Sequence, residues 1–273
     1  MRDSFARAAT TYDAAAVIAG EVGRRMAERL DYVKIQPARM ADIGCATGDG
    51  IRALLKRYPQ ALPLAIDFAN PMLMEVGRRT PWLSGLTRRG PRLANADVGK
   101  LPIKSGALGL VWSNLMLQWL DDPATAFAEL HRVLATEGLL TFSMLGPDTL
   151  KELREACKAC GIEPPLRQFL DMHDVGDALV QAGFADPVMD MEMMTLTYRS
   201  PRGLLRDQRH LGVRDGLLGQ LRWREWRRVM RAWEMTRKDG RLSASFEIVY
   251  GHAWKPQPKN IADGRTIVRF EPR

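Results

Sequence analysis

Apolar residues recur along this chain in two spacings, which predict helices and strands in alternation. Between residues 12 and 31 they return every three or four positions, as on one face of a helix. Short apolar runs then end in Asp42 and in Asp67, and a helical pattern begins at Ile51 between them. Further strands are expected near residues 92–95, 108–112 and 138–145, with helices beginning at Asn70 and spanning 123–134. This order predicts an α/β, doubly wound and mostly parallel sheet of seven strands.

The pattern changes in the last third of the chain. A helix is expected over 171–183, a strand over 187–198, a helical block over 199–237 and a final strand over 243–254. A helical insertion between the last two strands is a natural place for a substrate lid. We therefore divide the chain into an N-terminal helical lid (1–35), a core (36–198), a lid insertion (199–240) and a last strand with a C-terminal tail (241–273).

The turn after the first strand has the features of a ligand site. Gly44 and Gly48 let the backbone turn sharply without side chains in the way of a ligand, and the next helix begins with free N–H groups. Asp67 ends the second strand, where a carboxylate can accept hydrogen bonds from both hydroxyls of a ribose. Together with Asp42, these residues indicate a nucleoside pocket. A tight turn without a ligand is the alternative.

Composition narrows the class of protein further. A hydrophobic fraction of 46% and a charged fraction of 26% are typical of soluble globular chains. No apolar stretch reaches the length of a membrane span, and the first residues lack the apolar core of a signal peptide. Three cysteines argue against a disulfide framework, and four scattered histidines form no metal-binding motif. We expect a cytoplasmic monomer that binds no metal.

Several motifs resemble those of methyltransferases that depend on S-adenosylmethionine. Residues 42–48 read Asp-x-Gly-x-Ala-x-Gly, with Ala46 where the superfamily has its middle glycine. Residues 5–13 (F-x-R-A-A-x-x-Y-D) and 112–119 (W-S-N-L-x-x-Q-W) are similar to the malonyl-[acyl-carrier protein] O-methyltransferase family of biotin synthesis. The resemblance covers nearly the whole chain. It implies a Rossmann-like methyltransferase fold, S-adenosylmethionine as cofactor, and methylation of the free carboxylate of malonyl-acyl-carrier protein, which starts pimeloyl synthesis.

The resemblance also implies roles for individual residues. Asp67 would bind the ribose hydroxyls, Asp42 the methionine amino group and Asp97 the adenine amino group. Each acid has a simpler alternative, in which it only caps backbone N–H groups or lies in an exposed turn. The full set of expected cofactor-binding residues is Tyr12, Asp42, Gly44, Cys45, Ala46, Gly48, Asp67, Phe68, Asp97, Val98, Asn114 and Leu115.

Arginines are concentrated in the expected lid insertion. Residues 199–231 hold ten arginines and three acids, and ten minus three gives +7 of the formal charge of +8. Guanidinium groups bind carboxylates and phosphates well, which suits an acidic acyl-carrier protein with its phosphopantetheine. A solvated basic face is the alternative. The residues expected to contact the partner are Arg206, Arg209, Arg224, Arg227 and Arg228.

The expected reaction needs no general base, because a malonyl carboxylate is already ionised near neutral pH. An arginine buried beside that carboxylate would orient it, although the sequence does not identify which one.

Two other functions stay open. Residues 146–154 and 246–255 also resemble the mitochondrial complex I assembly factor that hydroxylates an arginine. Residues 222–228 interleave arginines with tryptophans, as an RNA-binding surface does. Two features count against a function in RNA binding or RNA methylation. Residues 113–116 lack the Asn/Asp-Pro-Pro-Tyr motif of nucleobase methyltransferases, and Trp223, Trp226, Met230 and Trp233 fall on one helical stripe that would pack inside the lid.

Overall fold

One sheet of seven strands forms the centre of the molecule. The structure is a computed structural model that describes residues 1–81 and 90–258. In it the strands lie in the order β3-β2-β1-β4-β5-β7-β6. Only β7 pairs antiparallel with its neighbours. The bounds are β1 Arg39–Ile43, β2 Leu62–Asp67, β3 Arg92–Asn95, β4 Leu108–Asn114, β5 Leu134–Leu145, β6 Ala185–Tyr198 and β7 Leu242–Trp254. The expected doubly wound sheet is confirmed.

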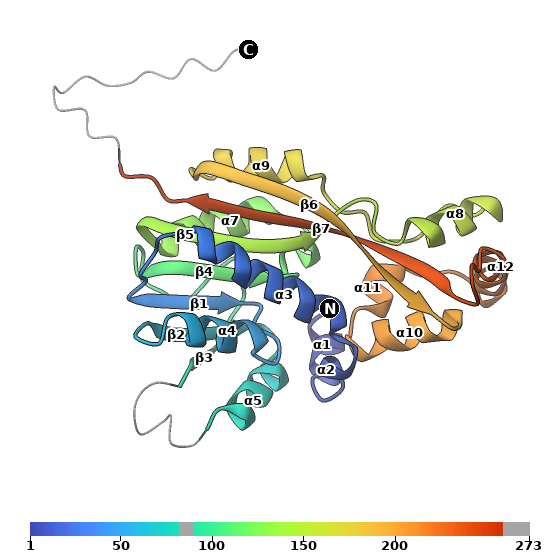
Figure 1. Ribbon diagram of the computed structural model, residues 1–273, viewed down its shortest axis with the longest axis horizontal. Helices are drawn as coiled ribbons and strands as arrows, with labels where there is room; N and C mark the ends of the chain where they lie inside the picture. The colour runs from blue at the N-terminus through green and yellow to red at the C-terminus, as the bar shows by residue number, and fades with distance from the viewer. Residues whose placement is uncertain (82–89, 259–273) are drawn as a thin grey trace, which may run out of the picture.

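Helices cover both faces of this sheet because successive strand residues point to opposite sides. Leu110 and Trp112 of β4 pack with the helices on one face, whereas Val111 packs on the other. The first face is covered by α3 (Val17–Arg29), α4 (Asp49–Arg57) and α5 (Asn70–Arg79). The second is covered by α7 (Pro123–Val133) and α9 (Met172–Gln181). The sheet therefore lies between two layers of helices (Figure 1), with an apolar cluster on each of its faces.

The strand order reverses between β1 and β4, and this reversal positions the site. β2 and β3 extend the sheet on one side of β1, while β4 and β5 extend it on the other. The connections after β1 and β4 therefore leave the sheet in opposite directions, which opens a crevice at the carboxyl ends of these two strands. Asp42 and Asn114 lie at this edge of the sheet.

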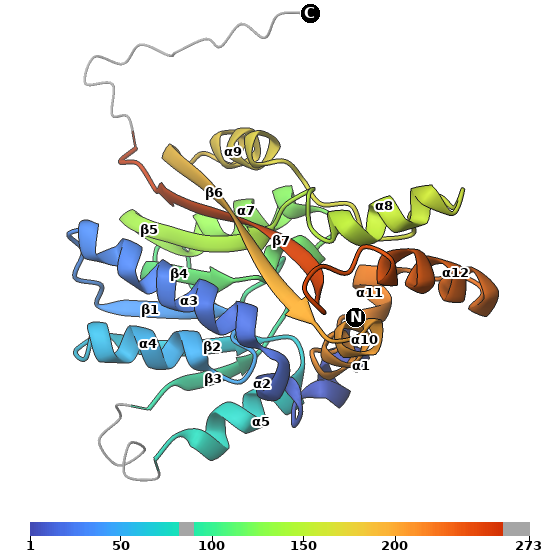
Figure 2. The same cartoon turned by 45° about the vertical axis from the view of Figure 1, so that its right-hand side comes forward.

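A helical lid lies beyond that edge (Figure 1). It consists of α10 (Pro201–His210), α11 (Arg214–Leu218) and α12 (Trp223–Glu234), all between β6 and β7, with α8 (Lys151–Ala159) packed against α12. The N-terminal helices α1 (Arg2–Ala8) and α2 (Tyr12–Ala15) lie beside α10, as both ribbon views show (Figure 2). The hydroxyl of Thr11 donates to the carbonyl oxygen of His210 at 3.1 Å. The N-terminal helices and the insertion between β6 and β7 thus meet over the crevice.

The structure corrects several expected boundaries. The helix expected over 12–31 is interrupted at Ala16, whose backbone leaves the helical region with ψ of 31°. The helical block over 199–237 is three helices, because Gly212 and Gly219 have positive φ and end α10 and α11. A side chain at Gly212 would also approach the carbonyl oxygen of Ser4 to 2.7 Å. The strand expected from 138 begins at Leu134.

The prediction that one face of α12, with its three tryptophans, is buried is only partly correct. Trp233 is buried and its indole N–H donates to the carbonyl oxygen of Ser243, and Trp226 and Met230 pack against the core. Trp223 begins α12 and is 74% exposed. The buried face of α12 therefore starts one turn later than the spacing indicates. The C-terminal tail expected up to residue 273 lies outside the described residues after 258. No described helix has the length and apolar character that a membrane crossing requires.

Candidate functional site

The turn after β1 has a backbone conformation that favours glycine. Gly44 and Gly48 have φ of 73° and 91°, a region in which L side chains are strained. A side chain at Gly44 would come within 2.3 Å of Met116, so only glycine fits there. Ala46, at the position where the superfamily motif has glycine, also has positive φ, at 45°. The N–H groups of Gly44 and Cys45 donate to the carbonyl oxygen of Ile66, which ties the turn to β2.

Asp67 fixes this turn from the end of β2. Its side chain is 7% exposed, and its two carboxylate oxygens accept from the backbone N–H groups of Ala46 at 3.0 Å and Ala69 at 2.8 Å. Burial raises the pKa of Asp67, and these N–H groups act in the opposite direction by stabilising the charge. Each carboxylate oxygen has a second lone pair. Asp67 can therefore bind a ligand hydroxyl and still hold the turn.

Asp42 lies deeper, at the end of β1. It is 2% exposed, and burial raises its pKa to about 7. Among the described residues, its Oδ2 atom and the indole Nε1 of Trp112 have no hydrogen-bond partner. Both atoms face the space left by Gly50, where a side chain would lie 2.6 Å from Asp42 Oδ2 and 2.7 Å from Trp112 Nε1. Two buried polar atoms without partners point to a missing ligand or water.

A cavity of about 270 Å³ opens beside Asp67. Most of the expected cofactor-binding residues line it, namely Tyr12, Gly44, Ala46, Asp67, Phe68, Asp97, Val98, Asn114 and Leu115. Asp42 and Cys45 line a narrower hollow that shares Gly44 and Ala46 with the first. Gly48 lies in neither lining and instead precedes α4 in the left-handed conformation. The structure thus gathers eleven of the twelve expected residues at one edge of the sheet.

Four aromatic side chains cover this cavity as a roof, of which Tyr12 and Phe68 were expected and Phe5 and Trp119 were not. Phe5 of α1 packs edge-on against Phe68 and Trp119, with ring centroids 5.8 and 6.2 Å apart. Phe5 and Trp119 both occur in the motifs at residues 5–13 and 112–119, and that was the available signal. Tyr12 completes the roof, and burial raises the pKa of its hydroxyl, which stays protonated. The hydroxyl of Thr47 donates to Asp13 at 2.6 Å and joins the roof to the glycine turn.

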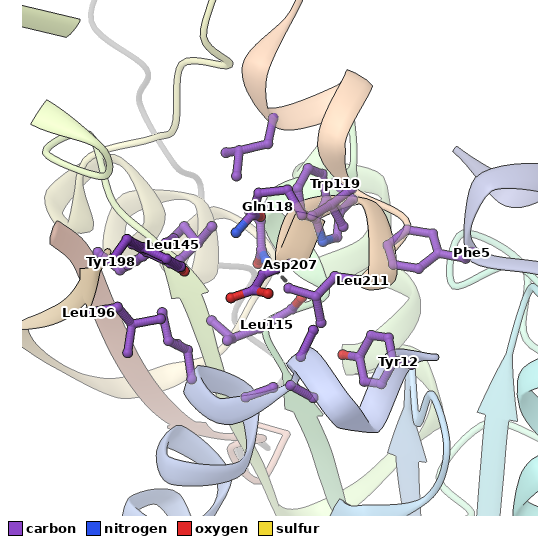
Figure 3. Close-up of a pocket in the computed structure, with 18 residues that line it drawn as sticks. Phe5, Tyr12, Leu115, Gln118, Trp119, Leu145, Leu196, Tyr198, Asp207 and Leu211 are labelled. Carbon is purple, nitrogen blue, oxygen red and sulfur yellow. Dashed lines mark hydrogen bonds between the residues drawn. The ribbon is translucent and has the colours of Figure 1, made fainter. Parts of the chain in front are cut away.

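A second, smaller cavity of about 80 Å³ adjoins the first beneath the lid (Figure 3). The two share Phe5, Tyr12, Leu115 and Trp119. The other walls come from α2, α3, β5, β6, β7, α10, α11 and Gln118, and they are mostly apolar. Among the described residues, no lysine or arginine lines either cavity. The expected arginine beside the substrate carboxylate is therefore not found there.

The five arginines expected to contact a partner lie elsewhere. Arg206, Arg209, Arg224, Arg227 and Arg228 are all exposed, on α10 and α12. The opposite face of α12 is buried through Val229 and Trp233. We call this exposed set the arginine surface. It lies on the lid helices, and none of its residues lines either cavity.

Comparison with known proteins agrees with this geometry. Residues 41–142 match the family model described as a methyltransferase domain. A malonyl-[acyl-carrier protein] O-methyltransferase of Gallionella capsiferriformans (strain ES-2) is 50% identical and covers 98% of this chain and 94% of its own. That of Laribacter hongkongensis (strain HLHK9) is 46% identical over 100% of this chain and 95% of its own.

Solved structures share the fold. A Haemonchus contortus phosphoethanolamine N-methyltransferase 2, in complex with S-adenosyl-L-methionine, superposes with a TM-score of 0.53 at 17% identity. The match covers 86% of this chain and 52% of that one. A methyltransferase-like protein of Bacillus halodurans C-125 gives 0.59 at 14% identity, over 85% of this chain and 99% of that one.

Asp42 makes the stability of the ligand-free protein depend on pH. Its pKa rises from 3.8 to about 7 on folding, so the folded state keeps a proton that the unfolded chain releases. This stabilising contribution is complete below about pH 4 and is lost as the pH rises through about 7. Asp42→Asn stays neutral and removes the effect. Between about pH 5 and about pH 8, the unfolding temperature of the wild type should fall by several degrees relative to this variant.

Differential scanning calorimetry at several pH values measures this difference. Asp177→Asn, at an exposed position on α9, is the matched control and should follow the wild type. Parallel pH profiles for the wild type and Asp42→Asn would show that Asp42 is ionised throughout this range.

Proposed function

Because the chain belongs to the malonyl-[acyl-carrier protein] O-methyltransferase family, we propose that it transfers a methyl group from S-adenosylmethionine to the free carboxylate of malonyl-acyl-carrier protein. In biotin synthesis this gives the methyl ester that starts the pimeloyl chain. The names of its curated relatives agree with carboxyl methylation rather than arginine hydroxylation or RNA methylation. The observation that carries the proposal is the pair of adjoining cavities, one suited to a nucleoside and the other of a size that suits a small acyl group.

The first cavity has the chemistry that S-adenosylmethionine requires. Asp67 offers free lone pairs for a ribose diol, and Asp97 and Val98 lie where adenine would reach them. Asp42 Oδ2 lacks a partner, and the amino group of the methionine moiety would supply one. Phe68 and Phe5 provide apolar surface for the base. These contacts support the assignment of the eleven lining residues to cofactor binding.

The reaction depends on positioning. S-adenosylmethionine supplies a methyl group on a sulfonium whose departure leaves a neutral sulfur. The acceptor carboxylate is ionised near neutral pH and needs no base. The protein must align the two partners and keep water away from them. Leu115, Phe5 and Trp119 surround the junction of the two cavities with apolar surface and serve this purpose.

Mass spectrometry tests the function directly. Malonyl-acyl-carrier protein incubated with this protein and S-adenosylmethionine should gain about 14 Da, the mass of a CH₂ unit. The gain should be absent when acetyl-acyl-carrier protein, which has no free carboxylate, replaces it. Labelling of RNA or of a protein arginine, with the malonyl substrate unchanged, would instead support one of the alternative functions.

The arginine surface is suited to docking the carrier protein. Acyl-carrier proteins are acidic, and exposed opposite charges steer association. Trp223 lies 74% exposed next to Arg224, and tryptophan with arginine is the combination found at the centre of many protein interfaces. Arg228 also donates to the carbonyl oxygen of Cys160, which fixes its side chain against α8. This surface lies on the lid helices, so a docked carrier could deliver its acyl arm beneath the lid.

Charge reversal on α12 should impair recognition of the carrier alone. We expect Arg227→Glu with Arg228→Glu to raise KM for malonyl-acyl-carrier protein roughly ten-fold or more, since several ion pairs become repulsive. The affinity for S-adenosylmethionine and turnover of malonyl-CoA should change little. Steady-state kinetics at two salt concentrations measures this, because the wild-type advantage should shrink as salt screens the charges.

Lys34→Glu with Lys56→Glu is the matched control. Both lysines are exposed near the opposite edge of the sheet, and their reversal should leave every parameter unchanged. Equal losses on malonyl-CoA and on the carrier substrate would place Arg227 and Arg228 in the fold or the active site. Salt-sensitive RNA binding that the α12 reversal abolishes would favour a nucleic-acid function.

A further inference from the structure

The turn after β4 supplies walls to both cavities. It contains the short 3-10 helix η2 (Leu117–Trp119) and continues to Asp121. Gln118 and Trp119 line the second cavity, where they lie side by side (Figure 3). Trp119 also lines the first cavity, together with Leu120 and Asp121. The position of this turn therefore sets the shape of the junction between the two cavities.

Arg167 holds this turn from outside the cavities. It belongs to the segment between α8 and α9 and is not among the described residues that line either cavity. Its Nε donates to the carbonyl oxygen of Gln118 at 3.0 Å, and its Nη2 donates to that of Leu120 at 3.1 Å. The guanidinium carbon lies 5.9 Å from the centroid of the Trp119 ring, within the range of a cation–π contact. One side chain thus contacts three consecutive residues of the turn.

This pair of hydrogen bonds requires a guanidinium group. Arginine presents its N–H donors in one plane, so two neighbouring carbonyl oxygens can accept from different nitrogens at the same time. The ammonium of a lysine is a single point on a flexible stem and does not reproduce this fork. The side chain of Arg167 is 24% exposed, whereas Asp121, whose carboxylate is 3.3 Å from Nη2, is fully exposed. An ion pair with so exposed a partner contributes little, so the carbonyl contacts are the ones that fix the turn.

The backbone of Arg167 ties the same turn to the lid. Its N–H donates to the carbonyl oxygen of Leu217 in α11 at 2.9 Å, and its carbonyl oxygen accepts from Arg154 of α8 at 2.7 Å. Leu217 lines the second cavity from the lid. Phe169, two residues after Arg167, packs edge-on against Trp119 with ring centroids 6.5 Å apart. The segment around Arg167 therefore fixes the turn after β4 relative to the lid helix α11.

We propose that Arg167 is a positioning residue for methyl transfer, which holds Gln118 and Trp119 at the junction of the two cavities and couples them to α11. The proposal rests on the proposed function. Arg167 itself touches neither substrate nor cofactor and acts through Trp119. Methyl transfer requires close alignment of the two partners, and misplacing one by about 1 Å can cost about a hundred-fold in rate. A turn released from Arg167 would also open the junction to water.

This role predicts a loss in kcat rather than in cofactor affinity. Asp67 and Asp97 lie at the ends of β2 and β3, which Arg167 does not hold. Arg167→Ala should therefore lower kcat about ten- to a hundred-fold for malonyl-CoA and malonyl-acyl-carrier protein alike, and change the dissociation constant of S-adenosylmethionine less than about three-fold. Arg167→Lys should recover little of this loss, because it restores the charge without the fork. Steady-state kinetics and calorimetry measure the two quantities.

Arg57→Ala is the matched control. Arg57 ends α4, its guanidinium carbon lies 5.7 Å from the ring centroid of Tyr58, and it pairs with the carboxylate of Asp31. Its side chain is 29% exposed, which is close to the value for Arg167, and it lines neither cavity among the described residues. The control should lower the unfolding temperature about as much as Arg167→Ala does and leave kcat unchanged.

A double variant tests the route through Trp119. If Arg167 acts by positioning that ring, the losses in kcat of Arg167→Ala and Trp119→Phe should not multiply when the two are combined. Losses that multiply would overturn this route.

Two further results would overturn the positioning role, namely wild-type kcat in a folded Arg167→Ala protein or wild-type kcat in Arg167→Lys. If circular dichroism shows that Arg167→Ala does not fold, Arg167→Lys decides in the same way. A wild-type protein that methylates no malonyl thioester refutes the proposed function instead, so the two failures are distinguishable.

Discussion

The site depends on one carboxylate that holds two turns at once. Asp67 accepts from Ala46 in the turn after β1 and from Ala69 in the turn after β2, so it joins the two connections on one side of the sheet reversal. Both bonds stabilise the charge of a carboxylate that burial would otherwise neutralise. This contact keeps the glycine turn open with Ala46 in a left-handed conformation, which alanine rarely adopts.

A second constraint follows from the lid. α1 and α2 meet α10 through Thr11, while α1 also covers the nucleoside cavity with Phe5. The two cavities therefore share Phe5 of α1 and Tyr12 of α2, and α10 lines the second cavity alone. Apolar side chains over both cavities exclude water from their junction, which is where the methyl transfer would take place. Asp42 Oδ2 and Trp112 Nε1 lack a hydrogen-bond partner among the described residues, and stability given up in this way is typical of functional sites.

The sequence predicted the parts of this molecule that depend on local spacing. The strand-end acids, the glycine turn and the alternation of strands and helices can each be recognised in a stretch of about thirty residues. The structure places Asp42, Asp67 and Asn114 at one edge of the sheet, as expected. The second cavity was not predictable in this way. Its walls combine Leu115, Tyr198 and Asp207 from distant segments, and only the sheet order, with β7 placed between β5 and β6, brings them together. Periodicity also overestimated the buried face of α12, because Trp223 precedes the turn at which the helix first meets the core.

The central claim is that Asp67 binds the ribose of S-adenosylmethionine while holding the glycine turn. Isothermal titration calorimetry on Asp67→Ala tests it most directly, with Asp177→Ala on exposed α9 as the control. Losing charge-assisted acceptors for two hydroxyls should weaken the affinity for S-adenosylmethionine roughly a hundred-fold, with the control unchanged. Circular dichroism should confirm that the variant remains folded. Wild-type affinity in a folded Asp67→Ala protein would contradict the account and remove Asp67 from the cofactor site.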